Sequence, residues 1–97
     1  MAVIVRLVRG AEIRYIEWST TVDAPVTRGM TREALEHHYR VRYGAVGMLE
    51  LPGRLARADE YGTSSFADTL DDLLAVNRAG PRESHITLDQ IWELYCT

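Results

Sequence analysis

The sequence contains no lysine, one cysteine and three histidines, and these shortages limit what the chain can do. All eleven basic residues are arginines. A GC-rich genome explains this most simply, because lysine codons are AT-rich; selection for bidentate anion contacts is the alternative. The single cysteine, Cys96, cannot form an internal disulfide, and the adjacent His37 and His38 do not match the spacing of a metal pair. We therefore expect no metal and no cofactor.

Positive charge is also in short supply. The net charge is −3, which disfavours nucleic acid and anionic membranes as partners. Arg40, Arg42, Arg54 and Arg57 could still cluster, so a DNA-binding regulator is a disfavoured alternative.

No run approaches the ~18 apolar residues of a membrane helix, and the first residues lack the pattern of a signal peptide. We expect a cytoplasmic protein.

Length and composition indicate a single domain over residues 1–97, with 46% apolar residues to build its core. Two β-branched runs, about 2–9 and 12–19, are separated only by Gly10 and Ala11, which is typical of a two-residue type II′ hairpin turn. That turn pairs residues whose numbers sum to 21, which places Arg9 opposite Glu12.

The pleat of this hairpin predicts two faces of unequal character. The first face looks like core: it carries Val3, Val5, Leu7, Ile16 and Trp18 and is interrupted by Arg14. The second face is more apolar than a solvated sheet face usually is: it carries Ile4, Val8, Ile13 and Tyr15, together with Arg6 and Glu17. A third strand, a helix or a second copy of the chain should cover this face or extend the edge. For this reason we predict a homodimer.

Three to four helices should pack against the hairpin, which makes the fold α+β. The first helix is predicted over 31–43, with Thr31 as N-cap and Gly44 after its end. The second is predicted over 51–61, with Pro52 in its first turn. The acidic pair Asp59-Glu60 belongs to a solvated face of that helix, or to a contact with a basic partner.

Two further helices complete the prediction. Ser65 and Asp68 suggest a cap for a helix over 66–76, with Phe66 in its apolar stripe; the alternative makes 73–77 a short strand. Thr87 and Gln90 form a capping box for a helix over 88–96.

The connection 18–31 has no apolar period, and such long connections in a small domain tend to be functional or mobile. We expect it to contribute partner-binding residues: Trp18, Ser19, Thr20, Asp23 and Pro25. The polar ones among them can equally serve their own backbone, and Trp18 can belong to the core.

No catalytic motif stands out. Ser19, Asp23 and a histidine could be arranged as a triad, but no nucleophile elbow supports them, so we predict no catalytic residues and lean against an enzyme. One anion site is conceivable at the start of the first helix, where free backbone N–H groups attract negative charge. Its residues would be Thr27, Arg28, Thr31 and Arg32, although ordinary capping with solvated arginines also explains them.

Several segments spread over most of the chain resemble a family of small uncharacterised proteins from phages of actinobacteria. They are Glu17 to Pro25, Gly29-Met-Thr31, Tyr43-Gly44, Gly62 to Ser65 and Asn77 to Pro81. The resemblance implies a phage gene product that acts in a bacterial host cytoplasm, and it implies no mechanism. We expect a non-enzymatic accessory protein that binds a host or phage protein, partly through the 18–31 loop. A small enzyme or sensor that binds an anion or nucleotide at the first helix is the alternative.

Overall fold

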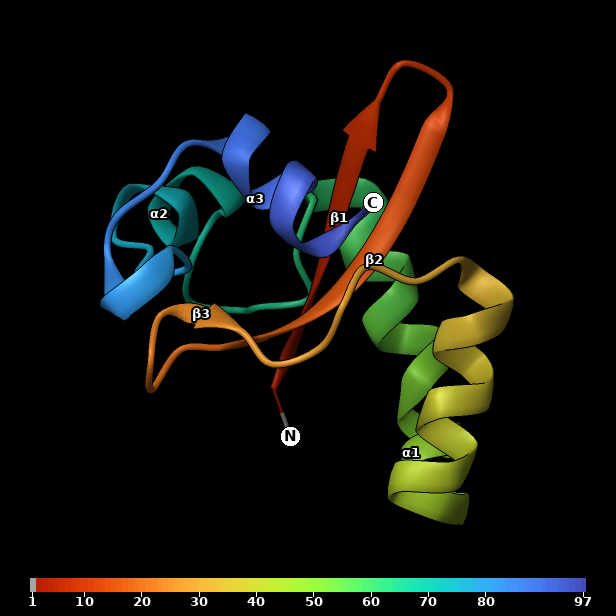
Figure 1. Ribbon diagram of the computed structural model, residues 1–97. Coiled ribbons are helices and arrows are strands. Elements are labelled where there is room, and N and C mark those ends of the chain that lie inside the picture. The colour runs from red at the N-terminus through yellow and green to blue at the C-terminus, as the bar shows by residue number, and fades with distance from the viewer. Residues whose placement is uncertain (1) are drawn as a thin grey trace.

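The computed structural model describes residues 2–97 and has the predicted α+β architecture. Strands β1 (Val3–Arg9), β2 (Glu12–Ser19) and β3 (Ala24–Pro25) form an antiparallel sheet in the order β1-β2-β3. Helices α1 (Arg32–Tyr61), α2 (Leu70–Ala75) and α3 (Leu88–Tyr95) pack around it (Figure 1). A 3₁₀ turn at Pro81–Glu83 lies between α2 and α3.

The hairpin has the predicted register. Val3 pairs with Trp18, Val5 with Ile16 and Arg9 with Glu12. Gly10 adopts a φ of +60° and Ala11 keeps a negative φ, as a type II′ turn requires.

Each face of the hairpin has its own core. The first face packs against α2 and α3, in a cluster that includes Trp18, Leu73, Ile91 and Trp92. Helix α1 covers the second face. The members of that second cluster are Ile4, Tyr15, Leu35, Tyr39, Leu51, Leu55 and Ala58.

The sheet edges are also covered within the chain. Residues 62–64 pair with β1, where Arg6 N donates to Gly62 O and Ser64 N donates to Ile4 O, both at 2.8 Å. Strand β3 and Met30 pair with the other edge of the hairpin. This chain itself therefore covers the Ile4 and Tyr15 part of the second face and parts of both edges, whereas Val8 and Ile13 on the same face stay exposed.

Helix α1 is bent sharply at Gly44, whose φ of 65° and ψ of −148° are not helical. Its two arms run side by side as a helical hairpin (Figure 1). Thr31 caps the first arm through a hydrogen bond from Ala34 N, as predicted. The second arm begins earlier than the predicted residue 51, so Pro52 lies inside the helix rather than in its first turn. The described residues thus form three α-helices, and a count of four is not confirmed.

The predicted start of the third helix at 66 is wrong. Helix α2 begins at Leu70, because Thr69 and Asp72 form a complete capping box and outcompete Ser65. Ser65 instead accepts hydrogen bonds from Ala67 N and Asp68 N in a local turn. Phe66 therefore lies outside the helix, and the strand alternative for 73–77 is also wrong, since the helix continues to Ala75.

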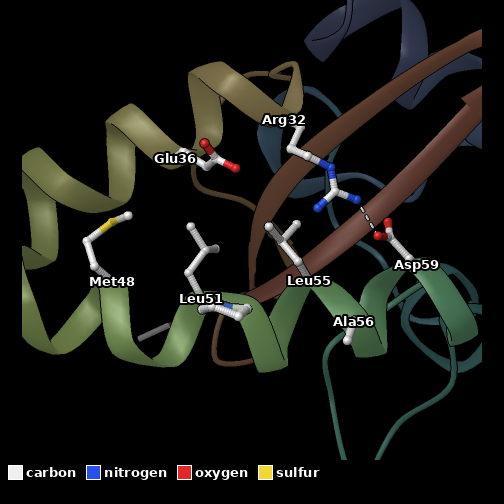
Figure 2. Close-up of a pocket in the computed structure, with 8 residues that line it drawn as sticks. Arg32, Glu36, Met48, Leu51, Leu55, Ala56 and Asp59 are labelled. Carbon is white, nitrogen blue, oxygen red and sulfur yellow. Dashed lines mark hydrogen bonds and ion pairs between the residues drawn. The ribbon is translucent and has the colours of Figure 1, made fainter.

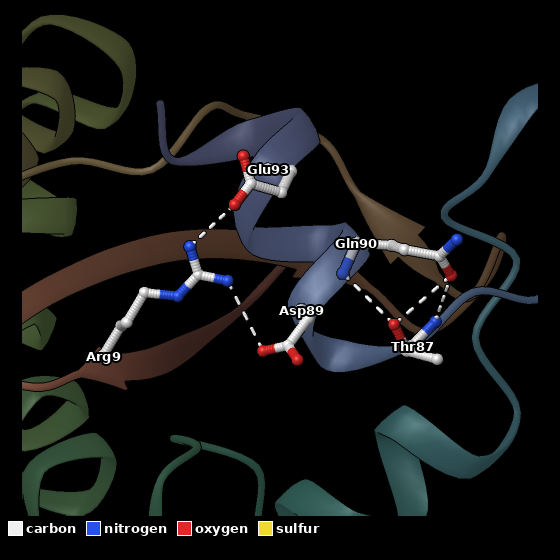
Figure 3. Close-up of polar contacts among 5 residues, drawn as sticks. All are labelled: Arg9, Thr87, Asp89, Gln90 and Glu93. Carbon is white, nitrogen blue, oxygen red and sulfur yellow. Dashed lines mark hydrogen bonds and ion pairs between the residues drawn. The ribbon is translucent and has the colours of Figure 1, made fainter.

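Helix α3 follows its prediction, with the Thr87–Gln90 capping box in place. The Arg9 side chain, however, does not pair with Glu12. It reaches α3, where it donates to Glu93 at 2.8 Å and to Asp89 at 3.4 Å (Figure 3). The helix offers two carboxylates one turn apart, which suit the forked guanidinium better than a single cross-strand glutamate.

Candidate functional site

The 18–31 connection is built into the fold. Trp18 is fully buried in the first core cluster, so its side chain is not available as a surface contact. Pro25 lies in β3, directly opposite Trp18. Asp23 has a φ of +56°, and its carbonyl accepts from Arg78 N at 2.7 Å. Much of this segment is therefore explained by sheet extension.

The exposed part of the connection is a short turn. Ser19 is half-buried, and its hydroxyl accepts from Thr21 N at 3.2 Å and from Val22 N at 3.4 Å. Thr20 is exposed at the tip. Of the five predicted contact residues only Trp18 is buried: Thr20 is exposed, and Ser19, Asp23 and Pro25 are half-buried.

The four residues of the predicted anion site do not converge. Arg28 donates to Thr97 O at 2.6 Å, whereas Arg32 bonds to Asp59. Thr31 is used as the helix cap, and Thr27 accepts from Glu17 N at 3.0 Å. The side chains of all four residues therefore already have hydrogen-bond partners within the fold.

Arg32 and Asp59 close one end of a groove between the two arms of α1 (Figure 2). Tyr15 donates to the same carboxylate at 2.7 Å, and Arg6 Nε lies 3.6 Å from it. Burial alone would raise the pKa of Asp59, but these donors and positive charges outweigh it and lower the pKa. Asp59 is exposed, in agreement with the predicted solvated face, but its carboxylate also takes part in an ion-pair cluster that was not predicted.

The groove itself holds about 520 Å³ and has an apolar floor, in which Leu51 and Leu55 point between the arms (Figure 2). Arg32, Glu36 and Asp59 line its rim.

A second polar cluster lies under the first arm of α1 and was not predicted. Glu17 is only 2% exposed, and Tyr43 donates to its Oε2 atom at 2.6 Å. His38 Nε2 lies 3.2 Å from Oε1, but the two atoms are not aligned as a hydrogen bond. Burial and the bond to Glu17 both raise the pKa of Tyr43.

The Glu17 cluster opens into a hollow of about 500 Å³, which we call the Glu17 hollow. The exposed turn of the 18–31 connection forms one wall and the end of the first α1 arm forms another. Its lining residues are Ala2, Val3, Glu17, Ser19, Thr20, Thr21, Val26, Arg42 and Tyr43.

The two most exposed large apolar side chains of residues 2–97, Phe66 and Leu49, lie elsewhere, over the second arm of α1 and the turn that follows it, and Tyr61 lies near them. Phe66 is 87% exposed, Leu49 is 82% and Tyr61 is 64%. The guanidinium carbon of Arg57 stacks 4.1 Å from the centre of the Phe66 ring, and Arg57 Nε donates to Ser64 O at 3.0 Å.

Two hollows flank this stack. Leu49 and Gly53 line the one of about 430 Å³, and Tyr61 and Ala67 line the one of about 570 Å³. We call these residues with Arg57 and Phe66 the Phe66 surface. The sequence prediction missed it because Phe66 was assigned to a buried helical stripe.

Residues 2–97 contain no group of three or more side chains placed to hold a metal ion. None of the helices described combines the length and apolar character needed to cross a membrane.

Comparison with known proteins gives no match: no family model, no curated protein and no solved structure resembles this chain closely enough to be assigned to it.

Proposed function

We propose that this chain is a non-enzymatic accessory protein of an actinobacterial phage, and that it binds a host or phage protein in the bacterial cytoplasm through the Phe66 surface. The observation that carries the proposal is the near-complete exposure of Phe66 and Leu49 on one continuous surface. Isolated apolar residues are common on protein surfaces, but an aromatic residue between two hollows is typical of an interaction site.

The local structure favours binding because Phe66 is held in place. Arg57 stacks on the ring and donates to Ser64 O, so part of the side-chain freedom that association would cost is already lost. Aromatic and arginine side chains dominate the free energy of binding in most interfaces. The partner that fits would place apolar side chains against Phe66 and Leu49 and acceptors against the outer edge of Arg57.

The exposed turn of the 18–31 connection is a second contact surface in this proposal. Thr20 and Asp23 represent it, since Trp18 packs in the core.

A pull-down from lysate of infected and uninfected actinobacterial cells tests the proposal, with bound proteins identified by mass spectrometry. Phe66→Ala should lose the specific partner while the domain stays folded, because the ring contributes little to the core. Binding of the purified partner should weaken by about 2 kcal/mol or more, the usual effect at a binding hot spot. Val76→Ala, which truncates an exposed apolar residue outside this surface, is the matched control.

Two further measurements test the exposed turn of the 18–31 connection and the predicted homodimer separately from the Phe66 surface. Thr20→Ala combined with Asp23→Asn tests the turn, since asparagine tolerates the positive φ at position 23. Sedimentation of the wild type separates partner binding from the predicted homodimer. Equal capture by wild type and Phe66→Ala would refute the role of the Phe66 surface.

A further inference from the structure

We propose that His38 and Glu17 form a pH-sensitive contact that holds the first arm of α1 on the sheet. Uptake of a proton by His38 closes the contact, and loss of that proton loosens the arm. The contact is separate from the Phe66 surface and does not depend on the function proposed above.

The contact brings together two polar atoms that the fold leaves without an aligned hydrogen bond. His38 Nε2 lies 3.2 Å from Glu17 Oε1, and both atoms are buried. Within residues 2–97 neither atom has an aligned partner. Because buried polar atoms normally form hydrogen bonds, two such atoms that face each other indicate a contact that a change of protonation can complete.

The two side chains differ in their access to protons. The carboxylate of Glu17 is sealed from solvent, whereas the side chain of His38 is 28% exposed and can exchange protons with water. An imidazolium donates from both ring nitrogens, so protonated His38 gives Glu17 Oε1 a donor of opposite charge. The fold has already desolvated the carboxylate, and the added positive charge compensates it.

Two tyrosines on the same arm also face the imidazole. The rings of Tyr39 and Tyr43 pack edge-to-face with it, at centroid distances of 6.4 Å and 6.1 Å, and Arg42 lies beside Tyr43. Burial raises the pKa of both tyrosines, so both stay neutral below pH ~8. They therefore do not titrate together with His38.

The other elements packed here leave the pair as the responsive contact. On the second arm of α1, Arg54 and Glu50 act on Tyr39, and they pair with each other at 3.4 Å. Strand β1 places the apolar Ile4 opposite Glu17. Among residues 2–97, Glu17 is the carboxylate that pairs with His38, so a proton on the imidazole acts on this contact.

Protonation of His38 stabilises the folded state, because only the folded protein offers the imidazolium a buried carboxylate. The stabilisation is therefore present below the ordinary histidine pKa of ~6.5 and is lost as the pH rises above that value. Asp59 and the buried tyrosines do not interfere, since the pKa of Asp59 is lowered and those of the tyrosines are raised, away from this range.

Hydrogen exchange of the backbone amides tests the proposal, followed by nuclear magnetic resonance on the ¹⁵N-labelled full chain at pH ~5.5 and ~7.5. Protection factors, which correct for the intrinsic pH dependence of exchange, report how often each segment opens. Those of residues 35–43 in the first arm should be about tenfold higher at the lower pH, the usual effect of a hydrogen bond between charged groups.

Two variants assign this change to the contact. His38→Gln should abolish the rise in protection, whereas His37→Gln, at the neighbouring exposed residue, should keep it. Glu17→Gln should also abolish the rise, because an amide carries no charge, and His38→Gln remains decisive if Glu17→Gln does not fold. His85 Nδ1 lies 3.0 Å from Asn77 O, and every variant retains this contact, so its contribution cancels in the comparison.

Three results would overturn the proposal. They are protection of the first arm that does not rise in wild type at the lower pH, a rise that persists in His38→Gln or Glu17→Gln, and a rise that His37→Gln abolishes as well. None of them bears on Phe66→Ala, so the two proposals fail separately.

Discussion

Asn77 is the buried polar residue on which the packing of α2 and α3 depends most. Its Nδ2 atom donates to Leu74 O at 2.7 Å and to Ile86 O at 2.8 Å, and its Oδ1 atom accepts from Ala79 N and Ile86 N. One side chain therefore joins the end of α2 to the segment that leads into α3.

Asn77→Ala should destabilise the domain by roughly 2–4 kcal/mol, because it leaves several buried backbone groups without partners at once. Urea denaturation followed by circular dichroism measures the change. Its control is Val76→Ala, a truncation at the neighbouring exposed residue, which should stay within ~0.5 kcal/mol of wild type. A loss below ~1 kcal/mol for Asn77→Ala would mean that water replaces these bonds.

Glu17 and Asp59 show why polar clusters are harder to predict than strands. Each has neighbours that are distant in the sequence: Tyr43 and His38 reach Glu17 from α1, while Tyr15 reaches Asp59 from β2 and Arg32 reaches it from the first arm of α1. Only the tertiary fold brings these groups together. The sequence does hold a trace of the first cluster, because Glu17 falls on a strand face that is otherwise largely apolar.

At the scale of the element, Gly44 separates α1 into its two arms. Its φ of 65° and ψ of −148° lie in a region that only glycine adopts at low cost. A side chain at this position would meet no other atom within 4 Å, so any effect of substitution comes from the backbone.

Gly44→Ala should therefore cost about 1–3 kcal/mol of stability in a denaturation experiment. Gly53→Ala lies in the second arm of the same helix and should be neutral or stabilising by up to ~1 kcal/mol, since alanine favours the helix. The nearest atom to its new Cβ is Arg57 Nη1 at 3.6 Å, an ordinary contact. If the two variants were equally stable, the bend would not require glycine.

The predicted element boundaries are correct where the sequence signal, a turn or a helix cap, lies within a few neighbouring residues. The Gly10-Ala11 turn, the Thr31 cap and the Thr87–Gln90 box each lie within a few residues, and each was predicted. The start of α2 was not predicted, because Ser65 and Thr69 both offer a cap and the complete Thr69–Asp72 capping box is the one that begins the helix. That error also concealed the Phe66 surface.

At the scale of the whole molecule, the hairpin separates two cores, and the one beneath α1 contains three tyrosines. Burial is the main cause that raises the pKa of Tyr15, Tyr39 and Tyr43 in the folded protein. Asp59 raises the pKa of Tyr15 further, and Glu17 does the same for Tyr43. The α1 half of the molecule therefore retains phenolic protons that an unfolded chain releases near pH ~10.

This difference predicts that the domain loses stability in alkali. A raised pKa in the folded state means that the full stabilisation is present below the unfolded pKa of ~10, and that it falls as the pH rises above that value. Each such tyrosine can contribute a slope of up to ~1.4 kcal/mol per pH unit.

Denaturation at a series of pH values above neutral measures this slope, and ultraviolet absorbance of phenolate follows ionisation in parallel. Part of the phenolate signal should appear only together with the loss of circular dichroism, since ionising the buried tyrosines requires the α1 core to open.

Tyr43→Phe should lower the stability at neutral pH by ~1–3 kcal/mol, because Glu17 loses its donor. The same variant should show a shallower alkaline slope, because one titrating group is gone. If its slope matched that of wild type, Tyr43 would not be coupled to folding, and the buried contact with Glu17 would not persist in solution.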